Sequence, residues 1–83
     1  MNNNSNELRD GEMIVVSLEI IDGKKVGSFK YRTNANTIEE AVCNMKKSLA
    51  YMVFKNKNTK IEKVITKIGE ISVFNFILSD FFV

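Results

Sequence analysis

The chain has 83 residues, enough for one small domain, and its composition of 45% hydrophobic and 27% charged residues is typical of a globular protein. Its net charge of +2 is too small to indicate nucleic-acid binding by charge alone. A single cysteine excludes an intramolecular disulfide, and no stretch approaches the roughly 18 apolar residues that span a bilayer. We therefore expect a cytoplasmic protein without a membrane segment.

Residue types that carry catalysis or bind metals are sparse. The chain has no histidine, the commonest general base and the commonest neutral metal ligand. Cys43 lies inside a predicted helix, where it suits a small, partly buried position better than a reactive thiol. Glu39 and Glu40 are adjacent, but neighbours on a helix point about 100° apart. We expect a protein that is not an enzyme and uses no metal or cofactor.

The first part of the chain predicts an arm followed by a β-hairpin. Residues 1–12 are polar and aperiodic, which favours a flexible N-terminal arm ahead of a single domain over residues 13–83. Residues 13–21 alternate between apolar and mixed positions and predict a strand. Asp22-Gly23 then predicts a two-residue type I′ turn into a second strand over residues 25–33.

The length of the hairpin loop decides which side chains share a face. With a two-residue or a four-residue loop, Phe29 and Tyr31 are expected on the buried face, together with Ile14, Val16 and Leu18. A three-residue loop would reverse this arrangement. The opposite face then carries the basic residues Lys24, Lys30 and Arg32, which can either contact phosphate groups or form a solvated surface that discourages strand aggregation. We favour the solvated surface.

Residues 37–56 are predicted to form one long amphipathic helix. Thr37 and Glu40 have the spacing of a capping box at its start. The apolar residues recur with helical spacing and are expected to form one buried stripe: Ile38, Ala41, Val42, Met45, Leu49, Met52 and Val53. Met45 and Leu49 are expected to pack on the first hairpin.

The remaining elements complete a small sheet. Residues 61–68 fit either a short helix or a strand, and the β-branched run at residues 64–66 slightly favours the strand. Residues 71–78 are apolar on both faces and predict a strand in the middle of the sheet or beneath another element. The expected class is α+β: a small antiparallel sheet in the order ββαββ, or ββααβ, with the long helix packed on one face.

The C-terminal residues carry an unusual group of aromatic side chains: Phe74, Phe76, Phe81 and Phe82. They can complete the core, or they can form an apolar patch that binds a partner or a second copy in a homodimer. We expect a small non-catalytic interaction module, a regulator or inhibitor that binds a protein target stoichiometrically. Small proteins without motifs are common in phages and mobile elements, where they block host or defence enzymes. The alternatives are a nucleic-acid-binding module that uses the basic hairpin face and a structural homo-oligomer subunit.

Overall fold

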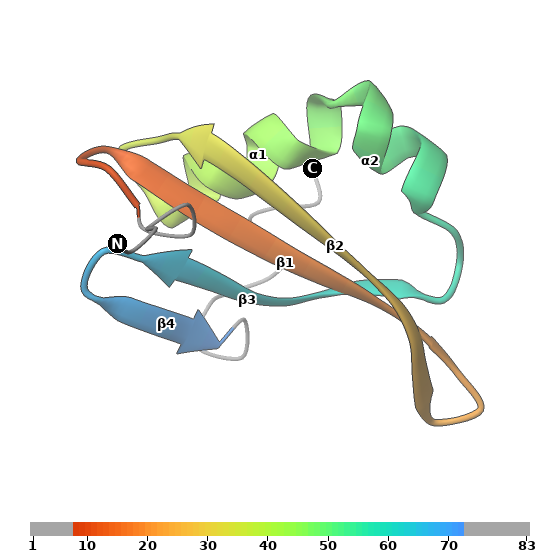
Figure 1. Cartoon of the computed structure of the whole chain (residues 1–83). Coiled ribbons are helices and arrows are strands. Elements are labelled where there is room, and N and C mark those ends of the chain that lie inside the picture. Colours follow the sequence, from red (N-terminus) through yellow and green to blue (C-terminus); the bar gives the residue numbers. More distant parts are fainter. Residues whose placement is uncertain (1–7, 73–83) are drawn as a thin grey trace, which may run out of the picture.

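The computed structural model describes residues 8–72, and residues 1–7 and 73–83 lie outside this range. The elements in chain order are β1 (Glu12–Ile21), β2 (Lys24–Asn34), α1 (Ile38–Lys47), α2 (Leu49–Phe54), β3 (Thr59–Thr66) and β4 (Gly69–Ser72). The strands form one antiparallel sheet in the order β2-β1-β3-β4, and the two helices lie over one face of it (Figure 1). The α+β class is therefore confirmed, with the element order ββααββ.

The turn between β1 and β2 is the one that the Asp22-Gly23 pair predicts. Both residues have positive φ, 54° at Asp22 and 77° at Gly23, as a type I′ turn requires. Ile21 and Lys24 pair directly on either side of it. The two-residue hairpin loop is confirmed.

A β-bulge close to this turn changes the register of the hairpin. Ile20 pairs with Lys25, but the next residue along β1, Glu19, pairs with Gly27. Val26 is therefore an extra residue in β2. One extra residue turns every following side chain of the strand to the opposite face.

Phe29 and Tyr31 lie on the face that packs against the core, as expected, but the bulge changes which β1 side chains share that face. Tyr31 lies opposite Val15, and Phe29 lies opposite Ser17, so these four side chains share the face that the helices cover. The prediction that Phe29 and Tyr31 share a face with Ile14, Val16 and Leu18 is wrong. The predicted two-residue loop is correct. Counting alternate positions along a strand does not detect a bulged residue such as Val26, which has no partner on the neighbouring strand.

The start of α1 is capped as predicted. The Thr37 hydroxyl accepts a hydrogen bond from the Glu40 N–H at 3.1 Å, and the Glu40 carboxylate accepts one from the Asn36 N–H at 2.8 Å. Together these bonds satisfy backbone donors that the first turn of a helix leaves without partners.

Residues 37–56 do not form one helix, because Ser48 interrupts it in an extended conformation, with φ −77° and ψ 144°. Its N–H and its hydroxyl both donate to the Met45 carbonyl, at 3.0 and 2.7 Å, and its hydroxyl accepts from the Tyr51 N–H at 3.1 Å. One serine thus ends α1 and begins α2, supplying the partners that both helix ends need.

The core lies between the sheet and α1. Its fully buried side chains come from β1, α1 and β3: Val15, Ala41, Val42, Met45 and Val64. Ser17 is also buried there, and its hydroxyl donates to the Met45 sulfur at 3.4 Å. The expected burial of Met45 is confirmed.

The end of the described chain adds two strands. Residues 59–66 form β3, so the strand predicted for residues 61–68 is confirmed over most of its length. β4 pairs only with β3 among the described residues, so residues 71–72 lie in the last strand of the sheet as it is described over residues 8–72. The rest of the strand predicted over residues 71–78 lies outside the described range.

Candidate functional site

Helix α2 has two apolar faces. One face carries Tyr51 and Phe54, whose ring centroids lie 5.7 and 5.2 Å from that of Phe29 on β2. Because residues three and four apart share a helix face, the three large non-aromatic residues of α2 gather on the other side. These residues form the α2 patch: Leu49, Met52 and Val53.

The α2 patch faces solvent. Leu49 is 80% exposed, Met52 50% and Val53 86%, so the prediction that these residues extend the buried stripe of α1 is wrong. The break at Ser48 puts the two halves of the helical segment out of phase. Because an aromatic side chain buries about 150–250 Å², the aromatic face of α2 gains more from contact with the sheet than the aliphatic face does.

The exposed residues have the spacing of a recognition surface. Leucine, methionine and valine at positions i, i+3 and i+4 are the pattern by which a helix inserts one face into an apolar groove or against another helix. The sequence carried a signal for this patch, since all six residues of LAYMVF are apolar and one face of the helix must remain uncovered. Which face of α2 remains uncovered depends on its contacts with Phe29, which is distant from α2 in the sequence.

Lysines flank the α2 patch on both sides along the chain. Lys46 and Lys47 precede it, and Lys55 and Lys57 follow it. Partial burial lowers the pKa of Lys46, an interaction with Cys43 acts in the opposite direction, and repulsion from Lys55 lowers the pKa again. Lys46, before α2, and Lys55, after it, are thus close enough for their charges to interact.

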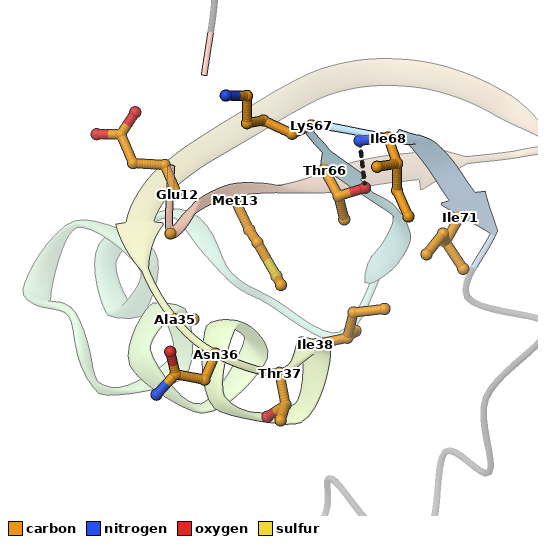
Figure 2. Close-up of a pocket in the computed structure, with 11 residues that line it drawn as sticks. Glu12, Met13, Ala35, Asn36, Thr37, Ile38, Thr66, Lys67, Ile68 and Ile71 are labelled. Atoms are coloured by element: carbon orange, nitrogen blue, oxygen red, sulfur yellow. Dashed lines mark hydrogen bonds between the residues drawn. The ribbon is translucent and has the colours of Figure 1, made fainter. Parts of the chain in front are cut away.

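A cavity of about 430 Å³ lies at one end of the sheet, beside the start of α1 (Figure 2). Its apolar lining comes from β1, the loop before α1, α1 itself, the turn between β3 and β4, and β4: Met13, Ala35, Ile38, Ile68 and Ile71. Figure 2 shows Glu12 and Lys67 directed away from it, and they pair with Arg32 at 3.1 Å and Asp10 at 2.6 Å. The cavity therefore suits an apolar group.

The basic residues of the hairpin are divided between two faces. Lys30 and Arg32 lie on the side of the sheet away from the helices, opposite Val16 and Ile14. The bulge places Lys24 on the other side and brings Lys25 round to the face of Lys30. This face also carries an ion pair of Lys63 with Glu70 at 2.9 Å, so its charges are mixed.

The four phenylalanines predicted to bind a partner, Phe74, Phe76, Phe81 and Phe82, lie outside the described residues. Within residues 8–72, no group of three or more histidine, cysteine, aspartate or glutamate residues is arranged to hold a metal ion. Neither of the two described helices is long and apolar enough to cross a membrane.

Comparison with protein-family models, curated proteins and solved structures finds no match to this chain.

Proposed function

We propose that the protein is a small non-catalytic interaction module, a regulator or inhibitor that binds a protein target stoichiometrically through the α2 patch. The observation that supports this proposal is the exposure of Leu49 and Val53, at 80% and 86%, on a helix that is already seated on its own sheet. Contiguous apolar side chains exposed in this way are typical of protein-binding surfaces.

The patch is large enough to contribute useful binding energy. Burying a valine, leucine or methionine side chain gains about 1.5–3 kcal/mol relative to leaving it exposed. Three such side chains can therefore supply several kcal/mol, the scale on which a few central residues dominate a protein interface. The contacts of Tyr51 and Phe54 with Phe29 hold α2 on the sheet, which lowers the entropy cost of presenting these side chains to a partner.

The test is a display selection of short helical peptides on the full chain. Peptides that bind the wild type should lose binding to a variant with Leu49, Met52 and Val53 all changed to serine. The matched control changes Ile21 and Ile68 to serine, because these large apolar residues are also exposed but lie far along the chain from α2. The control variant should bind the selected peptides as the wild type does.

Two results would overturn the proposal. One is a selection that yields no peptide whose binding depends on the α2 patch. The other is a large loss of stability in the serine variant, measured by urea unfolding, because solvent-exposed residues should be replaceable at little cost. Such a loss would mean that the chain itself covers the patch.

A further inference from the structure

The segment of the chain that contains the α2 patch is rich in positive charge. Residues 41–61 contain five lysines and no aspartate or glutamate, whereas the rest of the chain has seven cationic residues against ten acidic ones. Lys47, Lys55 and Lys57 form no ion pair with any residue in the described range. The nearby carboxylate of Glu19 accepts a hydrogen bond from the Asn56 side chain at 2.7 Å, on the loop after α2.

This distribution disfavours a second copy of the chain as the partner at this surface. A two-fold contact places the same patch on both subunits, so the lysines at either end of one α2 would meet those of the other. Like charges placed against each other across an interface are costly. The lysines beside the α2 patch therefore favour a negatively charged partner.

Resting on the proposed function, we infer that the partner of the α2 patch is an acidic amphipathic segment of a protein. Its aliphatic side chains would cover Leu49, Met52 and Val53, and aspartate or glutamate residues on either side would meet Lys47 and Lys55. The opposite charges of the lysines and the acidic segment would speed the encounter and set the orientation of the bound segment. The aliphatic contacts would supply most of the affinity.

An anionic membrane surface offers the same signs of charge but a poorer fit. α2 spans only residues 49–54, and its six residues extend about 9 Å, whereas helices that lie in a membrane interface commonly have 20–30 residues. The inner face of α2 is also occupied by its contacts with Phe29. A short ridge of three aliphatic side chains is better matched to a groove or helix of similar size.

The experiment reads the composition of the peptides selected on the full chain and measures their affinity for charge variants. Selected peptides should carry acidic residues beside aliphatic residues at helical spacing. Changing Lys47 and Lys55 together to glutamate should weaken binding about tenfold, and changing both to glutamine should weaken it less. Changing Lys24 and Lys25 to glutamate is the matched control and should leave binding unchanged. Added salt should weaken binding to the wild type.

The outcomes separate this inference from the proposed function. Peptides that depend on the α2 patch but show no acidic enrichment, or that bind the Lys47 and Lys55 variants as tightly as wild type, would overturn the acidic partner alone. A failure to select any patch-dependent peptide would overturn the proposed function as well. Sedimentation of the chain with phosphatidylglycerol vesicles, lost in the Lys47 and Lys55 variants and without peptide binding, would replace the protein partner with a membrane.

Discussion

The ring of Phe29 on β2 lies 5.2 Å from the ring of Phe54 on α2, with an angle of 22° between the ring planes. Tyr51 completes the contact from the same helix, with its ring centroid 5.7 Å from that of Phe29. These contacts hold α2 on the sheet and determine which of its two apolar faces meets solvent. Phe29 is therefore the residue through which the sheet orients the candidate binding surface.

Replacing Phe29 by alanine should lower the free energy of unfolding by about 3 kcal/mol, because it removes an aromatic side chain that three other rings contact. Urea unfolding followed by circular dichroism measures this loss. Val26→Ala, an exposed position on the same strand, serves as the control and should change stability by less than about 0.5 kcal/mol. A loss below about 1 kcal/mol for the Phe29 variant would show that other contacts seat α2.

The two helices should respond differently to the same kind of substitution. Met45 on α1 is fully buried, so Met45→Ala should cost about 2–5 kcal/mol. Leu49 on α2 is 80% exposed, so Leu49→Ala should cost less than about 0.5 kcal/mol. Urea melts of the two variants provide the comparison. Equal losses would mean that the helical stripe continues through Ser48 in solution.

Deleting Val26 tests the bulge. The deletion removes the extra residue of β2 and should turn Phe29 and Tyr31 away from the helices, leaving polar side chains against the core. We expect the shortened chain to lose its cooperative urea transition, while Val26→Ala keeps it. A deletion variant that unfolds at the wild-type midpoint would show that the register does not depend on this residue.

Tyr51 should make the protein less stable in alkali. Burial raises the pKa of Tyr51, and a hydrogen bond with Ser17 acts in the opposite direction. The pKa of Tyr51 is higher in the folded protein than in the unfolded chain, where it is about 10. The neutral Tyr51 side chain therefore contributes fully to the free energy of unfolding at lower pH, and this contribution is lost as the pH rises through the folded pKa. The free energy of unfolding should therefore fall more steeply above about pH 10 in the wild type than in Tyr51→Phe.

The ionisation itself can be followed by ultraviolet absorbance of tyrosinate. In a Tyr31→Phe background, Tyr51 is the one remaining tyrosine, since the chain contains two. The folded protein should ionise at higher pH than the urea-unfolded chain. Coincident titrations of the two states would contradict the assigned effect of burial.

The features that the sequence predicted correctly depend on a few neighbouring residues. The turn at Asp22-Gly23 requires positive φ at both positions, and the cap at Thr37 requires a hydroxyl three residues before a backbone donor. Such requirements are met within one short segment. The strands and the α+β class follow from them together with the alternation of apolar residues.

The faces of the elements could not be predicted in the same way, because each depends on one residue that interrupts a regular pattern. Gly27 beside Val26 was a signal for the bulge, since glycine inside a strand often marks one. Ser48 was a signal for the helix break, because serine is a preferred cap. The choice between the two faces of α2 is made by Phe29, and it follows only from the folded arrangement.

The double role of Ser48 has a consequence for how the molecule opens. The backbone hydrogen bonds of α2 begin at Ser48, where Met52 donates to its carbonyl at 3.1 Å, whereas the last bond of α1 ends there, with Ser48 donating to Met45. This pattern would let α2 unravel while α1 keeps every one of its bonds, and we expect α2 to be a separate unit of local unfolding. We expect its amide protons to exchange with solvent deuterium ahead of those of α1. A bound partner would slow that exchange at α2 first, so the helix that offers the surface also reports whether the surface is occupied.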